Sequence, residues 1–153
     1  MARTPLTIRP ARADDAASLS ELAFRSKAHW GYSSEFMEAC RAELTITPQS
    51  PGKAAVAEFD GRLAGFYALG PYDERCVELA DLFVEPGYIG SGVGRALLDH
   101  AKAAARESGH TAMRIEADPH AEPFYCHAGA QRIGVAPSGS IPGRSLPLLE
   151  LVL

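Results

Sequence analysis

The chain has 153 residues, the length of a single domain, and its 46% apolar and 22% charged residues are ordinary values for a globular protein with a buried core. A formal net charge of −4 without any basic run argues against nucleic acid as a partner. Three scattered cysteines give neither a disulfide framework nor a CxxC metal site, and no apolar run approaches the length of about 18 residues that a membrane span needs. We therefore expect one cytoplasmic domain over residues 1–153, with no metal centre and no membrane partner.

The first third of the chain predicts a short strand and two helices. Residues 6–9 read as a strand that Pro10 ends, and either Asp14 or Asp15 is a suitable N-cap for the helix that follows. After a turn over residues 26–34, a second helix is expected, with an apolar stripe of Phe36, Met37, Cys40 and Leu44. Residues 45–52, which contain two prolines, predict a loop.

The middle of the chain predicts a hairpin, a further strand and a long helix. Residues 54–59 and 63–69 flank Asp60-Gly61, a two-residue sequence typical of hairpin turns. After a turn at residues 71–75, the apolar run over residues 77–84 predicts a buried strand, and a glycine-rich loop leads from it into a helix closed by Ser108-Gly109. The apolar side of this helix is expected to hold Val93, Ala96, Leu97, Ala101, Ala104 and Ala105.

The last third predicts a strand over residues 111–117, a short helix around 124–128, and two final strands over 131–135 and 146–153. The element order is therefore βααβββαβαββ, an α/β (α+β) arrangement. The two final strands offer edges that would suit pairing with a second copy, so a homodimer is an open expectation.

The loop before the long helix is a candidate anion site. Gly90, Gly92 and Gly94 permit a sharp bend and carry no Cβ where a ligand approaches, and the first amides of a helix are unpaired donors. A P-loop would need GxxxxGK followed by Ser or Thr, which the sequence lacks. A dinucleotide fingerprint would need GxGxxG, whereas the sequence reads GxGxG with Arg95 at the sixth position. A tight turn without any ligand is the alternative.

Two segments resemble the GNAT N-acetyltransferase superfamily. LFVEPGYIGSGVGRALLDHA is similar to the acetyl-CoA-binding segment, Gln/Arg-x-x-Gly-x-Gly/Ala at the start of a helix; Gly92 and Gly94 match its glycines, whereas Ile89 stands where the family has Arg or Gln. ADPHAEPFYCHAGAQRIG is similar to the family segment Asn-x-x-Ala-x-x-Phe-Tyr. Asp118 takes the Asn position, and the matches are Ala121, Phe124, Tyr125 and Gly129.

The resemblance implies a GNAT fold, with a mixed twisted sheet of about six or seven strands and about four helices on its two faces. It also implies acetyl-CoA as cofactor, with the backbone amides of residues 89–95 holding the diphosphate. The residues expected to bind the cofactor are Leu82, Phe83, Val84, Ile89, Gly90, Ser91, Gly92, Val93, Gly94, Arg95, Asp118 and Phe124.

Acetyl transfer to an amine needs an uncharged nucleophile and benefits from an acid at the departing sulfur. A primary amine with a pKa of about 10.4 loses its proton at a cost of ~4–5 kcal/mol at pH 7, so a base or a desolvating pocket helps. The resemblance implies that Tyr125 is the acid, because a phenol with a pKa near 10 keeps its proton at neutral pH. The alternative is a core tyrosine whose hydroxyl caps a backbone group.

The expected base is Glu78, at a strand position where some relatives carry a catalytic glutamate. Asp81 is on the same strand, and period-two alternation predicts that it points to the opposite face. Three alternatives for Glu78 stay open: a solvated strand end, a partner for Arg75 or Arg114, and a water chain that replaces it as base.

His29, Trp30 and Tyr32 place three ring side chains in the turn between the first two helices. The resemblance implies that this turn overhangs the acceptor pocket, where aromatic faces attract a cationic amine; a packing plug between the helices is the alternative. Arg144, in the loop before the last strand, is expected in the opposite wall, where it can meet a substrate carboxylate. The remaining candidates, His110, His120 and His127, read as surface or helix-end residues.

The sequence therefore predicts an acetyl-CoA-dependent N-acetyltransferase that acts on a small-molecule or peptide amine by direct attack. The alternative is an acyl-CoA-binding sensor or interaction domain without turnover, which Ile89 favours. A Rossmann-type oxidoreductase is the third reading. The identity of the amine stays open, because acceptor pockets come from variable loops.

Overall fold

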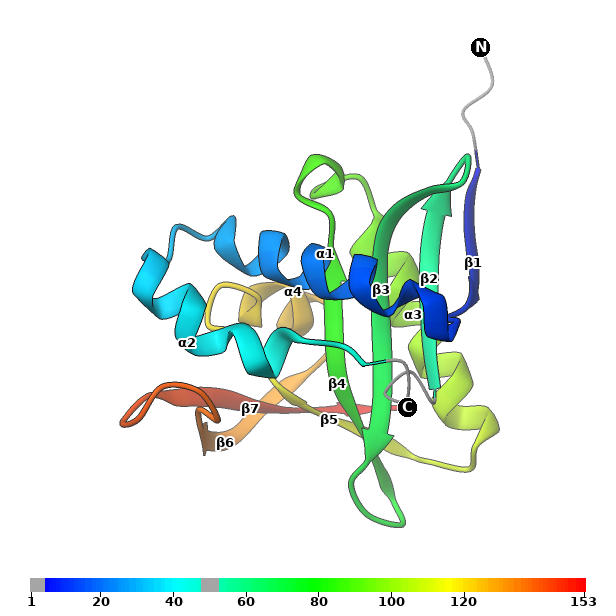
Figure 1. Cartoon of the computed structure of the whole chain (residues 1–153). Coiled ribbons are helices and arrows are strands. Elements are labelled where there is room, and N and C mark those ends of the chain that lie inside the picture. The colour runs from blue at the N-terminus through cyan, green and yellow to red at the C-terminus, as the bar shows by residue number, and fades with distance from the viewer. Residues whose placement is uncertain (1–4, 48–52) are drawn as a thin grey trace.

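Figure 1 shows the computed structural model, which describes residues 5–47 and 53–153. Its helices and strands are β1 (Leu6–Pro10), α1 (Ala16–Ala28), α2 (Ser34–Leu44), β2 (Lys53–Phe59), β3 (Arg62–Pro71), β4 (Cys76–Val84), α3 (Val93–Glu107), β5 (Ala112–Glu116), α4 (Glu122–His127), β6 (Gln131–Pro137) and β7 (Ser145–Val152). Single 3-10 turns precede α1 and follow β4. The predicted order βααβββαβαββ is confirmed. Residues 48–52 of the predicted loop lie outside the described residues.

The strands form one seven-stranded mixed sheet in the order β1-β2-β3-β4-β5-β7-β6. Neighbours are antiparallel except β4 and β5. The predicted hairpin is confirmed: φ is 50° at Asp60 and 77° at Gly61, the pair of positive values that a tight two-residue turn requires. Because β7 lies inside the sheet, only β6 of the two final strands is an edge, and the homodimer stays a prediction. No helix of the described ranges is long and apolar enough to cross a membrane.

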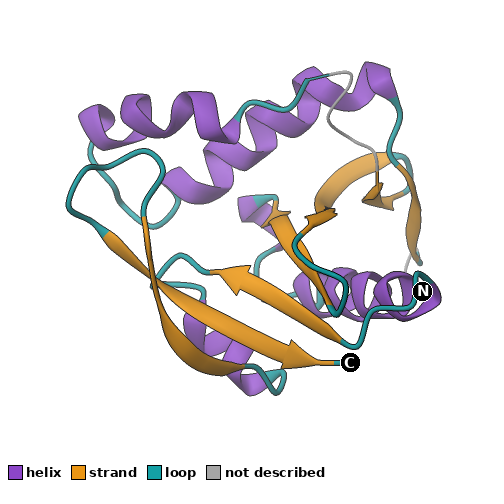
Figure 2. Ribbon diagram, turned by 90° about the horizontal axis from the view of Figure 1, so that it is seen from below, coloured by secondary structure: helices purple, strands orange, loops and turns teal. Residues whose placement is uncertain are grey.

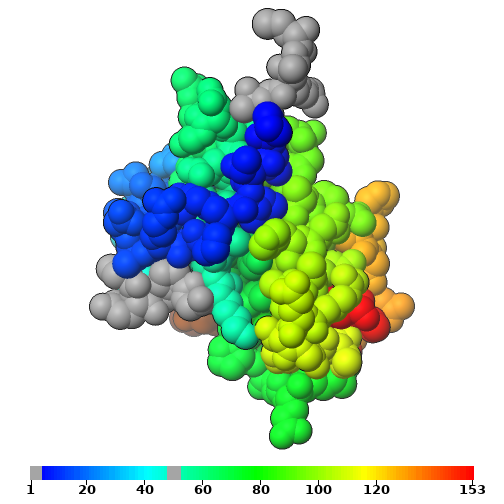
Figure 3. All heavy atoms as spheres, turned by 90° about the vertical axis from the view of Figure 1, so that its right-hand side faces the viewer, coloured from blue at the N-terminus to red at the C-terminus, as the bar shows by residue number. Residues whose placement is uncertain are grey.

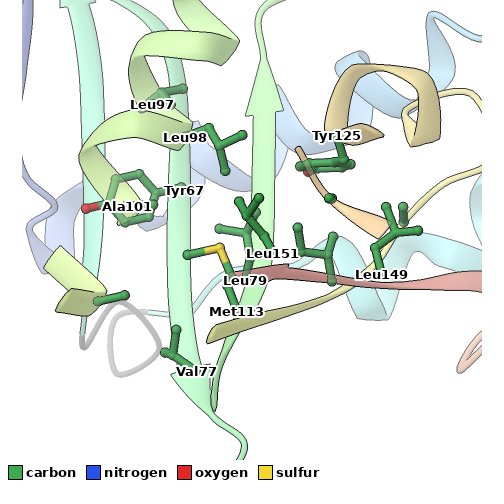
Figure 4. Close-up of a cluster of buried hydrophobic side chains, with 14 of the residues drawn as sticks. Tyr67, Val77, Leu79, Leu97, Leu98, Ala101, Met113, Tyr125, Leu149 and Leu151 are labelled. Atoms are coloured by element: carbon green, nitrogen blue, oxygen red, sulfur yellow. The ribbon is translucent and has the colours of Figure 1, made fainter. Parts of the chain in front are cut away.

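Helices cover both faces of the sheet. On one face, α3 buries Leu97, Leu98 and Ala101 against strand residues that include Met113 and Leu149 (Figure 4). On the other face, α1 and α2 pack side chains such as Leu22 and Met37 on Val56 and Phe66. Figure 3 shows α1 in blue and α3 in yellow-green on opposite sides of β1.

The buried side of α3 differs from the predicted one at three positions. Leu98 is buried, whereas Ala96 and Ala104 are only half-buried. The buried stripe is centred on Ala101, and Ala96 lies five residues away, which is about 140° around a helix with 3.6 residues per turn.

Two local predictions in the first third are corrected. Asp15 occupies the N-cap position of α1, yet its carboxylate accepts from both terminal nitrogens of Arg9, at 2.9 and 3.0 Å, and does not cap the helix. A guanidinium is a stronger partner than a backbone amide. Helix α1 also continues to Ala28, with Arg25 and Lys27 in its last turn, where the helix dipole favours cations, so the turn before α2 is shorter than predicted.

The single parallel pair opens the sheet. β4 and β5 pair only from Cys76 opposite Ala112 to Glu78 opposite Arg114. Beyond Glu78, β4 continues along β3 while β5 continues along β7, and Figures 1 and 2 show the two groups of strands diverging. The edge of β4 that faces β5 is therefore unpaired in its second half, and its backbone N–H and C=O groups can accept a partner there.

Candidate active site

A cavity of about 650 Å³ lies where β4 and β5 separate. Its walls combine residues 78–84 and 115–117 with parts of all four helices and of the segment between β6 and β7. Most of the predicted cofactor residues line it: Leu82, Phe83, Val84, Ile89, Gly90, Gly92, Gly94, Arg95, Asp118 and Phe124. Ser91 and Val93 are not among the lining residues, because the Ser91 hydroxyl donates to the Tyr88 carbonyl and Val93 is buried in the core.

The glycine loop places the N-terminal end of α3 at this cavity. φ is 85° at Gly90 and 92° at Gly92, which is the N-cap of α3, and a Cβ at either position would meet nothing within 4 Å. No side chain caps the helix there. The Ala96 amide makes a helical bond to the Gly92 carbonyl at 3.0 Å, so the amides of residues 93–95 come before the hydrogen-bond ladder and are donors for an anion.

Only part of the predicted amide run is available. The amides of Ile89 and Ser91 donate to the carbonyls of Pro86 and Tyr88, at 3.3 and 3.1 Å, and so close the turn before the helix. These two amides therefore have backbone acceptors in this structure, and the expectation that all amides of residues 89–95 bind a diphosphate stays a prediction. Among the described residues, the amides of Gly90, Gly92 and residues 93–95 have no backbone acceptor and remain as donors.

Tyr125 comes from α4 and is buried in the same core cluster as Val93 and Leu97 of α3. Its side chain lines the cavity and is only 6% exposed. Among the described residues, none accepts a hydrogen bond from its hydroxyl in this structure. Burial and the negative charge of Asp81 raise the pKa of the phenol above its ordinary value. The hydroxyl therefore keeps its proton throughout the neutral range and is not held by a partner within the described ranges.

A bulge in β4 brings two carboxylates to the same face. The pairing register between β3 and β4 shifts at this point. Ala68 of β3 pairs with Asp81 and the next residue, Leu69, pairs with Leu79, so Ala80 has no partner on β3. The extra residue reverses the alternation. Asp81 and Glu78 therefore line the same cavity, and the prediction that Asp81 points to the opposite face is wrong.

Burial and mutual repulsion make these carboxylates weaker acids. Burial, followed by the charge of Glu116, raises the pKa of Glu78. Burial, followed by the charges of Glu43 and Glu78, raises the pKa of Asp81 to about 6. Arg75 and Arg114 both pair with Glu150, at 2.9 and 3.3 Å, so neither neutralises Glu78.

We expect Asp81→Asn to stabilise the protein at pH 7.5. The pKa of Asp81 is raised from 3.8 to about 6 on folding, so its stabilising contribution is complete below pH 3.8 and is lost as the pH rises through 6. The free energy of unfolding falls by at most about 3 kcal/mol over this pH range. The Asn variant has no carboxyl group at this position, so it should not show this fall. Urea unfolding between pH 4 and 8 measures the difference, with the exposed Asp99→Asn as control. An identical pH dependence of Asp81→Asn and the parent would contradict this pKa.

Asp118 organises the opposite wall. It accepts hydrogen bonds from Lys27 Nζ at 3.2 Å, the Tyr32 hydroxyl at 2.8 Å and the His120 amide at 2.8 Å, and Arg144 lies 3.8 Å away. Burial by itself raises the pKa of Asp118, but the bonds from His120 and Tyr32 and the charge of Lys27 outweigh it and lower the pKa. The carboxylate is therefore a fixed anion that ties α1, the turn after it and the loop before α4 together.

Of the three ring side chains in the turn between α1 and α2 (His29, Trp30 and Tyr32), one lines the cavity. Trp30 lines the cavity and stacks on His120, with ring centres 5.1 Å apart. Tyr32 accepts from Arg144 Nη2 at 2.8 Å and belongs to the Asp118 network, whereas His29 is exposed and contacts Trp30 edge-on. His120, predicted as a surface or helix-end residue, is exposed and also forms part of the cavity wall.

A family model described as the acetyltransferase (GNAT) family matches residues 17–130, more than half of the 153 residues. The chain belongs to the GNAT family. The predicted resemblance is confirmed.

Curated relatives of this GNAT chain cover part of it. Uncharacterised N-acetyltransferases of Mycobacterium tuberculosis and Mycobacterium bovis are 36% identical over 78 residues, which are 48% of this chain and 49% of each relative. The alignment thus spans about half the length of these relatives.

Solved GNAT structures match over nearly the whole chain. A PaiA N-acetyltransferase from Thermoplasma acidophilum in complex with coenzyme A has a TM-score of 0.77 at 21% identity, with 97% of this chain and 99% of that chain covered. A GCN5-related N-acetyltransferase from Rhodopseudomonas palustris has a TM-score of 0.77 at 22% identity, with coverage of 100% and 99%. These likenesses confirm the predicted GNAT fold.

Sequence reasoning missed several side chains of this GNAT cavity, among them Lys27, Glu43, Glu116 and His120. Lys27 and Glu43 sit in charged helical stretches without any local signal. His120 does have a local signal. It follows Asp118 by two residues with a proline between, a spacing typical of turns in which the Asp side chain accepts a hydrogen bond from a backbone amide.

Proposed function

We propose that this chain is an acetyl-CoA-dependent N-acetyltransferase that transfers the acetyl group of the thioester to a primary amine. One observation carries the proposal: an uncapped helix end, a buried phenol without a partner among the described residues and two carboxylates of raised pKa line a single cavity. These are an anion cradle, an acid and a base, the groups that amine acylation requires.

The residues of the cavity fit the cofactor. The amides of residues 93–95 suit a diphosphate, and each exposed contact is worth ~0.3–1 kcal/mol, so several must converge. Close packing supports the cradle: a Cβ on Gly94 would lie 3.3 Å from Cε1 of Phe124. The unpaired edge of Leu82, Phe83 and Val84 suits the amide-rich arm of CoA, which can bond there as a further strand does. When bound, acetyl-CoA supplies an acetyl group activated as a thioester.

Tyr125 is the proposed acid. Its hydroxyl keeps a proton because its pKa is raised, and it can deliver that proton to the leaving sulfur. Glu78 is the proposed base, and Asp81 is the alternative that the bulge adds. Either carboxylate, when ionised, can take a proton from the incoming ammonium.

The two candidate bases give different pH–rate profiles in their variants. For the parent protein we expect kcat/KM to fall as the pH drops through the pKa of the base. Glu78→Gln should lower kcat/KM at pH 7.5 by up to about tenfold and remove this acid limb. If Asp81→Asn removes the limb and Glu78→Gln keeps it, Asp81 is the base and Glu78 is not.

The proposed function is tested by thiol release from acetyl-CoA in the presence of a panel of amines, with the acetylated products identified by mass. We expect release that depends on the amine. Binding of acetyl-CoA without amine-dependent release across the panel would instead support the sensor reading, which the substitution by Ile89 favours.

A further inference from the structure

Besides Asp118, four carboxylates line the cavity, and they come from three different elements. Glu78 and Asp81 of β4 are half-buried, whereas Glu43 of α2 and Glu116 of β5 are exposed at the rim. The charge of Glu116 acts on Glu78, and the charges of Glu43 and Glu78 act on Asp81. These four carboxylates, which we call the acidic path, line the same cavity as the buried residue Tyr125, and the charge of Asp81 contributes to the raised pKa of Tyr125.

No basic side chain of the described ranges neutralises this path. None of the ion pairs there involves Glu43, Glu78, Asp81 or Glu116. The cations that line the cavity are bound elsewhere: Lys27 and Arg144 lie by Asp118, at 3.2 and 3.8 Å, and Arg95 pairs with Asp99 at 3.2 Å.

A second observation concerns Tyr125, which shares the cavity with the acidic path. Tyr125 is more than nine-tenths buried, lines the cavity and donates to none of the described residues. Its hydroxyl is therefore free to form a hydrogen bond with a ligand in the cavity. The described carboxylates, histidines and cysteines include no group able to hold a metal ion, so an organic cation is the ligand that suits these charges.

We propose that the amine acceptor is a small aliphatic diamine or polyamine, with its reacting nitrogen beside Tyr125 and a distal ammonium bound by Glu43 and Glu116. The inference rests on the proposed function for the reaction itself. The nitrogen–carbon bond forms as the carbon–sulfur bond breaks. One ammonium proton leaves through a carboxylate to solvent, and Tyr125 gives its proton to sulfur and regains one from nitrogen.

The walls of the cavity favour a slender acceptor over a peptide. The Ser140 hydroxyl donates to Glu43, which joins the segment between β6 and β7 to α2. Arg144, on the same segment, donates to the Tyr32 hydroxyl at 2.8 Å. Because the two walls are bonded to each other at two places, a chain that enters end-on fits better than one that crosses the cleft.

Titration calorimetry of the CoA-saturated protein with 1,4-diaminobutane and with butylamine tests the inference without turnover. After the statistical factor for two equal nitrogens, we expect the diamine to bind about tenfold more tightly, because each rim carboxylate adds a modest ion pair. Glu43→Gln and Glu116→Gln should each reduce this ratio several-fold, and Glu43→Gln keeps an acceptor for Ser140. Glu35→Gln, an exposed change of the same charge on α2, should leave the ratio unchanged.

Equal affinities for the two amines, or a ratio that the rim variants leave unchanged, would overturn the inference. Tighter binding of a lysine-containing tripeptide than of the diamine would overturn it in favour of a peptide acceptor. These results are distinct from a failure of the proposed function. Thiol release with butylamine but no diamine preference rejects the diamine alone, whereas absence of CoA binding rejects the acetyltransferase.

Discussion

Tyr125→Phe is expected to lower kcat by about a hundredfold to a thousandfold, the usual range for loss of a positioned acid. Acetyl-CoA affinity should change by less than about twofold, because the ring that packs in the core is retained and only the hydroxyl is lost. The parent should show no alkaline fall in rate from this phenol below pH 9, since burial and Asp81 raise its pKa above the ordinary value.

Tyr67→Phe is the matched control for this variant. Tyr67 is a second buried tyrosine of the same core cluster, but it does not line the cavity, and its hydroxyl lies 2.8 Å from His100 Nδ1. Its variant should lose about 1 kcal/mol of stability and keep its turnover. Steady-state kinetics and urea unfolding of both variants separate the two roles. Normal turnover in Tyr125→Phe would leave Tyr125 as a core residue only.

Gly92→Val is expected to weaken CoA binding by about tenfold to a hundredfold. With φ at 92°, a side chain is strained by ~1–2 kcal/mol, and relief of that strain rotates the amides that open α3. Losing several contacts of ~0.3–1 kcal/mol each then accounts for the lower affinity.

The control is Gly109→Val at the other end of α3. Gly109 has φ at 89°, and, as at Gly92, a Cβ there would meet nothing within 4 Å, so a side chain is strained by its positive φ in the same way. Both variants should lose similar stability, but only Gly92→Val should lose CoA affinity in a calorimetric titration. Equal CoA affinity in the two variants would mean that the helix end does not hold the cofactor.

The parts of the fold that the sequence predicts well are those with local causes. Hairpin residues Asp60-Gly61, the alternating glycines and the helix closed at Gly109 each adopt a backbone conformation that their own residue types favour. The Phe124-Tyr125 pair could be placed for the same reason, because it belongs to a short helix bracketed by proline and glycine. Most of the cofactor-facing side of the cavity follows from these signals.

The acceptor side depends on contacts that no local pattern encodes. The bulge at Ala80 follows from how β4 pairs with β3, and this one extra residue decides which face Asp81 occupies. The bonds to Asp118 come from Lys27 and Tyr32, residues 91 and 86 positions earlier in the chain. Such contacts arise from tertiary packing. The sequence therefore predicted Tyr32 and Arg144 as site residues, but it did not predict that both lie beside Asp118.

A crystal structure of the chain with CoA bound tests the central claim most directly. We predict that the diphosphate lies on the amides of residues 93–95, with the Tyr125 hydroxyl within about 3.5 Å of the sulfur. A diphosphate bound elsewhere, or a hydroxyl turned away from the sulfur, would contradict the acetyltransferase mechanism derived from this cavity.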